Sequence, residues 1–356
     1  MDCYYCHDES DHNATDISRG ESELLSDALT VFILQVLIYG VTPGISVFGV
    51  AGNILSIAIL RRHGLRKCSN ILLISLALSD LLFLLGFNNI PKLLYDVVGN
   101  AGMYTYSFDL SFALYVMFII FNILNYASLG VSLTLPLLIT CERLAAVFLP
   151  LKFRDVFTPR RTWCSVFCIY AFWYAFFMHM SLYLTFSFEF FEPVNMTVGL
   201  IKRSQYHRDH LGTVHLLESL MSYLMMKIPA VATLAGCIAI WLKIKWVSLA
   251  RRQLTMKRAR DATRSHTTRI LLAVCTVYTI TCAIMSLPTF IPKYVYYTMT
   301  SDAPSNLSKI MYHLMNLAVC VNCSCNFVIY ILLNKNFRDT YRALLFTCKI
   351  LPFRGG

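Results

Sequence analysis

The residues of this chain that could do chemistry are charged side chains set within long apolar stretches. Asp80 lies about ten residues into one such stretch, far from either end of it. Glu142 and Arg143 form an adjacent charge pair at the end of another, which carries no charged residue between Asp109 and Glu142. Ionisable groups at membrane depth are costly and usually face a bundle interior. Asp80 is therefore expected to be either a structural carboxylate capped by its neighbours or part of an inward polar site.

The polar residues of the segment from Leu110 to Arg143 follow one line. Asn125 and Ser132 are 7 positions apart, and Arg143 follows 11 positions later. At about 100° per residue, these offsets fall within roughly 20° of a single stripe along a helix. We expect this stripe to face the interior of a helix bundle, because polar groups are disfavoured against lipid.

These residues do not make a convincing enzyme or transporter. An intramembrane hydrolase needs paired aspartates or a serine with a general base, and Asp80 has no second carboxylate near it. A transporter would show inverted repeats, which the seven unlike segments lack. The Cys3 to His7 stretch has the spacing for covalent haem attachment, but a polar tail this short builds no packed pocket. Cys320, Cys323 and Cys325 without a histidine are expected to be small packing residues, so no cofactor is expected here.

The composition places the chain among polytopic membrane proteins. Its 356 residues are 57% hydrophobic and 14% charged, whereas soluble domains carry about 25% charged residues. Apolar runs of about 18 residues or more predict membrane helices. The seven runs are Val31–Leu60, Ile71–Tyr95, Leu110–Cys141, Trp163–Phe186, Leu216–Trp241, Ile270–Tyr297 and Ile310–Leu333. The predicted fold is an all-α membrane protein with a seven-helix bundle.

Loop charges predict the orientation of the bundle. Lys and Arg gather in the loops on one side, most densely between Lys243 and Arg269, and this side is expected to be cytoplasmic. Acidic residues gather in the N-terminal tail and in the loops on the other side. The net charge of +11 is thus the sum of a basic inner and an acidic outer face, and nucleic acid is a poor explanation for it. The tail has no basic region followed by an apolar one, so no signal peptide is expected.

The predicted organisation is an extracellular tail (1–30), a membrane domain (31–334) and a cytoplasmic end (335–356) of a multi-pass plasma-membrane protein. Residues from Lys335 to Phe346 alternate charged and apolar side chains at helical spacing, which predicts an amphipathic eighth helix on the inner leaflet, with Cys348 as an acyl-chain site. Glycosylation sequences on the predicted outer side begin at Asn13, Asn195 and Asn306. Kinks are expected at Pro229 and Pro288.

Taken in order, several of these residues resemble the motifs of one receptor family. They are Asn53, Asp80, Glu142–Arg143, Pro229, Pro288 and the segment from Asn326 to Tyr330. In this order across seven helices, the chain resembles a rhodopsin-family G-protein-coupled receptor over about residues 31 to 347. Phe327 in place of the usual proline, followed by Phe337–Arg338, resembles the invertebrate FMRFamide, myosuppressin and sex-peptide receptor branch.

The resemblance implies specific roles. Arg143 would be the switch arginine, held by Glu142 at rest and meeting the C-terminus of a heterotrimeric G-protein after helix 6 swings outward. Tyr330 would rotate inward on activation. The polar core would hold a sodium ion as an allosteric ligand, which agrees with the preference of hard cations for oxygen ligands. Its members would be Asp80, Ser132, Asn322 and Asn326, with Asn53 close by.

The chain also departs from the family pattern. The position of the usual helix 3 cysteine is Phe118, and the outer loop from Ser187 to His215 has no cysteine, so this loop must be held some other way. The switch positions that differ are Leu144, Cys237, Cys282 and Ser286. These losses imply altered basal activity, and they keep open an alternative function as a receptor-like binding scaffold or decoy with weak or no coupling.

The class of ligand is narrowed by exclusion. The resemblance requires a helix 3 carboxylate for a monoamine, where this chain has Asn125, and a helix 7 lysine for retinal, where it has Cys320. A peptide therefore remains as the expected ligand, one that is amidated and cationic. The acidic outer face would attract its positive charge. The expected pocket residues are Asn122, Asn125, Tyr126, Glu218, Tyr223, His313 and Asn316. Interhelical hydrogen bonding is the alternative role for Glu218, Tyr223, His313 and Asn316.

Overall fold

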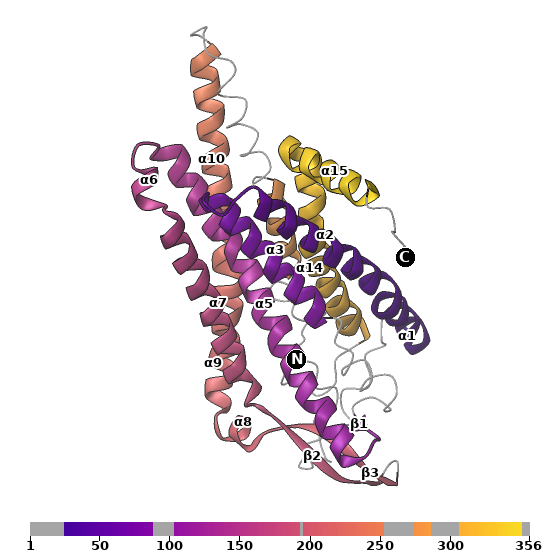
Figure 1. Ribbon diagram of the computed structural model, residues 1–356. Helices are drawn as coiled ribbons and strands as arrows, with labels where there is room; N and C mark the ends of the chain where they lie inside the picture. The colour runs from indigo at the N-terminus through magenta and orange to yellow at the C-terminus, as the bar shows by residue number, and fades with distance from the viewer. Residues whose placement is uncertain (1–24, 88–102, 193–194, 253–272, 286–305, 351–356) are drawn as a thin grey trace.

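The computed structural model describes residues 25–87, 103–192, 195–252, 273–285 and 306–350. Within these ranges, six helices are long and apolar enough to cross a membrane, and Ala273–Met285 is a shorter apolar helix from the sixth predicted run. The helices lie side by side in an elongated bundle (Figure 1). The long helical elements are α1 (Asp27–Gln35), α2 (Thr42–Arg62), α3 (Cys68–Phe87), α5 (Phe108–Phe148), α7 (Pro159–Ser181), α9 (Leu211–Ser222), α10 (Ile228–Arg252), α14 (Asn306–Leu333) and α15 (Lys335–Ile350).

Two helices are continuous through a short π-helical stretch, and each stretch ends next to a proline. The π-helix η1 (Val36–Val41) joins α1 to α2 just before Pro43. The π-helix η3 (Tyr223–Lys227) joins α9 to α10 just before Pro229. Because proline has no N–H to donate, the local bonding shifts from i−4 to i−5 acceptors, as in the bond from Ile228 to Tyr223. A π-helical stretch therefore precedes Pro229, where a kink was expected, whereas Pro288 lies outside the described residues.

The central helix α5 extends beyond the predicted run, which was expected to end at Cys141. It begins after Ser107 and continues past Glu142 and Arg143 to Phe148. The residue before a proline is disfavoured in helical conformation, and Leu149, which precedes Pro150, leaves the helix with φ −123° and ψ 54°. The charge pair consequently lies inside a regular helix rather than at its frayed end.

The fourth predicted run, Trp163–Phe186, was wrong at its C-terminal end. α7 stops at Ser181, and Leu184–Phe191 forms strand β2. From Leu184 onward apolar and polar residues alternate, which is the period of a strand rather than a helix. A count of apolar residues alone could not separate these two elements.

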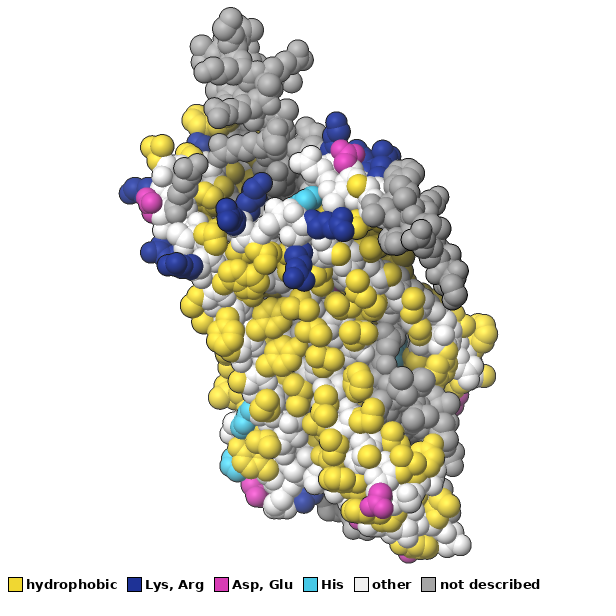
Figure 2. All heavy atoms as spheres, in the orientation of Figure 1, with side chains coloured by type: hydrophobic (Ala, Val, Ile, Leu, Met, Phe, Trp, Pro, Cys, Tyr) yellow, Lys and Arg dark blue, Asp and Glu magenta, His cyan; other side chains and the backbone are white. Residues whose placement is uncertain are grey.

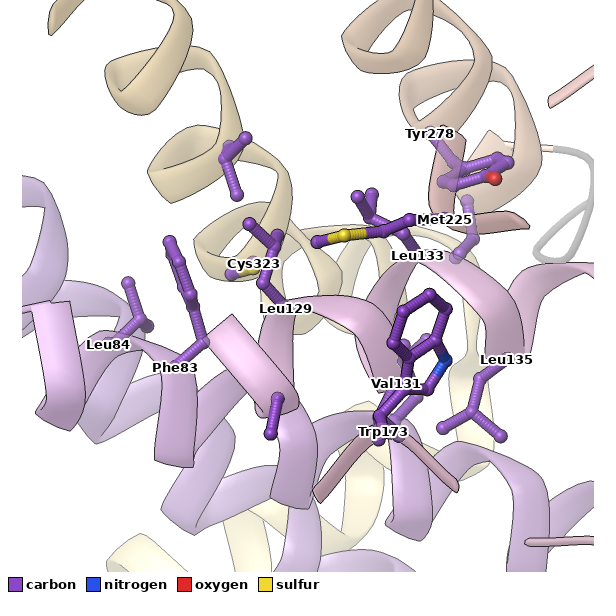
Figure 3. Close-up of a cluster of buried hydrophobic side chains, with 14 of the residues drawn as sticks. Phe83, Leu84, Leu129, Val131, Leu133, Leu135, Trp173, Met225, Tyr278 and Cys323 are labelled. Carbon is purple, nitrogen blue, oxygen red and sulfur yellow. The ribbon is translucent and has the colours of Figure 1, made fainter. Parts of the chain in front are cut away.

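Buried side chains of α5 form the centre of the main hydrophobic core. Leu129, Val131, Leu133 and Leu135 are at most 5% exposed and point to different neighbours around the helix (Figure 3). Trp173 of α7 lies over Gly130, where an added Cβ would be 2.5 Å from the indole ring, and its Nε1 donates to Thr134 at 3.0 Å. α5 packs against α3, α7 and α10, so it sets the position of most of the bundle.

A three-stranded sheet closes one end of the bundle. β2 pairs antiparallel with β3 (Met196–Arg203), and β3 pairs with β1 (Met103–Tyr104), which immediately precedes α5. In Figure 1 this sheet lies at the bottom, at the end opposite α6 (Phe153–Val156) and α15. The β2–β3 hairpin is therefore held to the segment that precedes α5 by backbone hydrogen bonds.

Aromatic packing reinforces this attachment. Phe118, at the position where the family resemblance expects a cysteine, is 4% exposed and lies in a cluster with Tyr104, Leu114 and Ile201. The ring of Phe186 packs against neighbouring rings at centroid distances of 5.4 to 6.1 Å. Those rings belong to Phe108, Phe112 and Tyr115. Hydrophobic contact and strand pairing thus connect this loop to α5, in place of the disulfide that the sequence lacks.

The surface of the bundle matches a membrane setting. Figure 2 shows a broad hydrophobic band around the middle, with Lys and Arg side chains gathered toward the end where α6 and α15 lie. At that end Lys243 lies over the ring of Trp246 and Lys245 over that of Trp241, with distances of 4.5 and 5.0 Å. Tryptophan and lysine together mark membrane interfaces.

We predict that Phe186→Ala loosens the sheet locally. Removing this half-buried ring should cost roughly 2 kcal/mol of local stability, or about 30-fold faster amide exchange in β3. Hydrogen exchange of the purified protein would measure this. Phe190→Ala is the matched control, because Phe190 is 58% exposed. Unchanged exchange in Phe186→Ala would show that the aromatic packing does not hold the loop.

Candidate functional site

Asp80 is a fully buried carboxylate bonded to two other helices. The Ser132 hydroxyl of α5 donates to Oδ1 at 2.5 Å, and the Asn326 amide of α14 donates to Oδ2 at 2.7 Å. Asp80 and Ser132 are 0% exposed and Asn326 is 4% exposed. Three of the predicted polar-core residues therefore meet, and one carboxylate joins α3, α5 and α14.

The other two predicted members lie at the edge of this cluster. Asn53 of α2 donates through Nδ2 to the carbonyl of Cys323 at 2.9 Å, so it fixes the backbone of α14 rather than Asp80 itself. Asn322 is buried at 6% exposure, but no contact between its side chain and Asp80 is found among the described residues. The Cys323 thiol, which sequence reasoning assigned to packing, lies 3.8 Å from the Ser132 hydroxyl.

The oxygen donors of the cluster fit a hard cation such as sodium. Asp80 supplies the charge, and Ser132 and Asn326 can each present oxygen by rotating a hydroxyl or an amide group. Cys323 is a poor ligand for such an ion, because sulfur prefers soft metals. Within the described ranges, no group of three or more His, Cys, Asp or Glu side chains is arranged to hold a metal ion.

Arg143 is held in a closed ring of side chains at the other end of the stripe. Its Nε lies 2.9 Å from Glu142 Oε2, and its Nη2 donates to the Ser69 hydroxyl at 2.6 Å. Ser69 in turn donates to Glu142 Oε1 at 3.2 Å. The Glu142 side chain is 2% exposed and that of Arg143 14%, so the ion pair is largely shielded from solvent.

A cavity of about 720 Å³ opens beside this ring. Arg143 and Tyr330, two of the predicted switch residues, both line it. The other lining residues are Leu60, His63, Lys67, Ser69, Asn70, Leu73, Asn334, Asn336, Phe337, Asp339 and Thr340. The cavity lies at the Lys- and Arg-rich end, between the α2–α3 turn, α5, α14 and α15.

The wall formed by α15 is fixed by packing and one polar contact. Phe337 is 0% exposed and its ring lies 6.1 Å from that of Phe327 and 5.6 Å from that of Tyr330. His63 Nε2 lies 2.9 Å from the Thr340 hydroxyl. Burial, and then the charge of Lys67, lower the pKa of His63 below its ordinary value. Neutral imidazole is thus favoured at this contact.

The predicted inward direction of the polar stripe is confirmed by burial. Asn125 is 8% exposed and Ser132 0%, and the side chain of Arg143 is 14% exposed. Asn125 lies against α3 at Gly86, where an added Cβ would be 2.7 Å from the Asn125 nitrogen. Only glycine at position 86 permits this approach of α3 and α5.

Away from the Arg143 cavity, three asparagine side chains carry buried atoms without a hydrogen-bond partner among the described residues. They are Asn122 Nδ2, Asn125 Oδ1 and Asn316 Nδ2. Close by, the Tyr126 hydroxyl lies 3.5 Å from that of Tyr312, which places α5 next to α14 at this level. Buried polar atoms are nearly always paired, so this region has an unused capacity for hydrogen bonding.

The other predicted pocket residues are Glu218, His313 and Tyr223, and their described contacts are with other side chains than these three asparagines. Glu218 pairs with His215 at 3.7 Å, and the His313 ring lies 5.3 Å from that of Tyr312. Tyr223 is 52% exposed and its ring lies under Lys227 at 4.2 Å. Because Tyr223 shares the exposed face of its helix with Leu220 and other exposed apolar residues, this placement argues against a pocket role.

The predicted modification sites differ in accessibility. Asn195 is exposed at the turn between β2 and β3, with φ 50°. Asn306 is 5% exposed and its Nδ2 donates to Leu25 O and Asp27 Oδ1 at 3.2 and 2.7 Å, which argues against glycosylation there. Asn13 and the side chain of Cys348 lie outside the described residues.

Sequence reasoning missed two residues that the structure places next to the site. Ser69 bonds both members of the charge pair, and Thr140 lies one turn from Arg143, where its hydroxyl donates to the Pro136 carbonyl at 2.8 Å. Serine and threonine commonly bond to their own helix, so nothing in the sequence marked these two as unusual.

Comparison with known proteins agrees with this geometry. The family model described as 7 transmembrane receptor (rhodopsin family) matches residues 52–330, which is 279 of the 356 residues. The match contains the Asp80 cluster, the Glu142–Arg143 pair and Tyr330. No curated protein matches the chain.

We predict that Asn326→Leu destabilises the bundle by about 1–3 kcal/mol, because Asp80 Oδ2 loses its donor in a fully buried position. Thermal unfolding of the purified protein would measure this. Val328→Ala, a change at a 37% exposed position of the same helix, is the control. An equal loss in both variants would show that the bond to Asp80 carries no special weight.

Proposed function

Because the chain belongs to the rhodopsin family of seven-transmembrane receptors, we propose that it converts binding of an extracellular peptide into nucleotide exchange on a heterotrimeric G-protein. In this proposal the tail faces the outside of the plasma membrane, and the Lys- and Arg-rich end faces the cytoplasm. Helix Ala273–Met285 belongs to the helix that moves outward on activation.

One observation carries the proposal. Arg143, whose side chain is 14% exposed, borders a cavity of about 720 Å³ at the basic end, and Tyr330 lines the same cavity. An arginine used only for packing or lipid anchoring would have no reason to border a cavity while held by two neighbours. This arrangement suits a residue that exchanges intramolecular partners for those of an incoming protein segment.

The resting state is stabilised by the ring of Glu142, Arg143 and Ser69. Hydrogen bonds to charged groups contribute about 1.5–3 kcal/mol each, so Arg143 leaves its partners only if the new contacts compensate. A bound ligand shifts such an equilibrium by as much as its affinities for the two states differ. The G-protein and the extracellular ligand would therefore each favour the same open state.

The proposed ligand is a peptide of the amidated, cationic kind. The unpaired carboxamide atoms of Asn122, Asn125 and Asn316 match the backbone and amide groups of a peptide, which donate and accept equally. The acidic residues of the tail and outer loops attract positive charge over long range. This agrees with the resemblance to invertebrate neuropeptide receptors, on which the subtype rests.

The proposed allosteric ligand is sodium at Asp80. The ion would lie among Asp80, Ser132 and Asn326 and would supply positive charge to a carboxylate that now depends on two hydrogen bonds. Its occupancy would favour the packing of α3, α5 and α14 found here. Ion binding and activation would then oppose each other, since activation rearranges these helices.

We predict that Arg143→Ala abolishes stimulated nucleotide exchange, with at least a tenfold loss, while peptide binding stays within about threefold. Cells expressing the chain would first be screened with amidated peptides, and the active peptide would then be used with purified G-protein. Arg160→Ala, which removes an exposed charge from the same end, is the control. Normal exchange in Arg143→Ala would overturn the assigned role, and binding without exchange in the unaltered chain would favour the scaffold.

We predict that sodium stabilises the receptor through Asp80. Replacing KCl by NaCl at equal ionic strength should raise the melting temperature of the purified chain, because a ligand specific for the folded state stabilises it by mass action. Asp80→Asn should remove this difference, whereas Asp109→Asn, at an exposed carboxylate, should keep it. A sodium effect that persists in Asp80→Asn would exclude this ion site.

A further inference from the structure

Three helices meet at Thr140, one turn from Arg143. The Thr140 hydroxyl lies 3.5 Å from the thiol of Cys275 in helix Ala273–Met285. On the α10 side, a Cβ added to Gly236 would lie 2.4 Å from the Thr140 methyl group. α5, α10 and helix Ala273–Met285 are therefore in direct contact at one level.

Two thiols face each other at this point. Cys237 of α10 follows Gly236, and its thiol lies close enough to interact with the Cys275 thiol and with Thr140. Cys275 is 2% exposed and Cys237 is half-buried, and both are free thiols. Because the Thr140 hydroxyl already donates to Pro136, it accepts from the Cys275 thiol.

We propose that Cys237 and Cys275 are a reversible oxidation site, at which a disulfide joins α10 to helix Ala273–Met285. The effect on signalling rests on the proposed function, in which the second of these helices must move outward. The formation of the bond does not rest on it. Both cysteines lie beside Thr140, so side-chain rotation and a small helix shift would bring the sulfur atoms to the S–S distance of about 2.05 Å.

The reaction balances with a peroxide as the oxidant. One thiol, once deprotonated, attacks the O–O bond of hydrogen peroxide and becomes a sulfenic acid, with loss of hydroxide, which takes up the released proton to form water. The second thiol attacks that sulfur, forms the disulfide and releases a second water. Two thiols and one peroxide thus give one disulfide and two waters, and a dithiol reverses the change by exchange.

This pair differs from the other described cysteines. Cys320 and Cys323 are near each other but belong to one helix, so a bond between them would tether nothing. Cys141, Cys164 and Cys168 are exposed and no described contact places another thiol against them. Disulfides on the reducing side of a membrane are usually transient and redox-sensing, which suits a bond with a regulatory effect.

Mass spectrometry of the full chain tests the bond directly. Trypsin releases residues 228–243, with Cys237 as the only cysteine, and residues 270–293, which contain Cys275 and Cys282. After treatment of receptor-containing membranes with hydrogen peroxide, these two peptides should be recovered linked, and dithiothreitol should separate them. The linked species should persist in Cys282→Ser and disappear in Cys237→Ala and Cys275→Ser. Its absence from the unaltered chain, or its persistence in Cys275→Ser, would overturn the proposal.

A second measurement tests the effect on signalling. Peroxide should lower basal nucleotide exchange on purified G-protein at least fivefold in the unaltered receptor, with recovery after dithiothreitol, and should leave Cys237→Ala unchanged. An equal loss in both would overturn the regulatory role. If the linked peptides form but Arg143→Ala exchanges nucleotide normally, the oxidation site stands and the proposed function fails, so the two failures are distinguishable.

Discussion

The structure depends on one constraint, which is that the polar stripe of α5 must face the interior of the bundle rather than lipid. A helix that crosses the hydrocarbon core pairs its backbone N–H and C=O groups internally, but its polar side chains find no water there for hydrogen bonding. Asp80 shows the consequence most clearly, because its two carboxylate oxygens are bonded from α5 and α14. A single side chain thereby fixes the relative positions of three helices. Apolar packing alone would fix these positions less specifically.

Toward the two ends of the bundle, strand pairing and aromatic packing also hold the elements together. At the end that carries the sheet, the chain uses strand pairing between β1 and β3 together with the packing of Phe118. At the basic end, Phe327 stands where the family resemblance expects proline, and its ring lies 5.7 Å from that of Tyr341 in α15. In both departures from the family pattern, phenylalanine stands where the resemblance expects a proline or a disulfide-forming cysteine. In each case a neighbouring helix or strand packs against the aromatic ring.

The sequence was sufficient to predict most of the helices, the burial of the polar stripe and the contact between Glu142 and Arg143. These follow from the lengths of the apolar runs, the helical period and the cost of burying charge. It was insufficient where position depends on more than one segment. The switch from α7 to β2 follows strand pairing with β3, and the exposure of Tyr223 depends on the rotation of its helix near Pro229. Ser69, Thr140 and Cys275 became notable only when folding brought distant helices together, since each residue type is ordinary in a membrane helix.

Two contacts of different chemistry hold the basic end in its closed arrangement. The ring of Glu142, Arg143 and Ser69 joins α5 to α3, so it does not by itself restrain helix Ala273–Met285, which moves in the proposed mechanism. The contact of Thr140, Cys237 and Cys275 joins α5 and α10 to helix Ala273–Met285, and its hydrogen bond is the weak one between Thr140 and the Cys275 thiol. The strong contact therefore positions the arginine, whereas the weak one restrains helix Ala273–Met285. In the proposed mechanism, a modest free energy of ligand binding would be enough to release this helix.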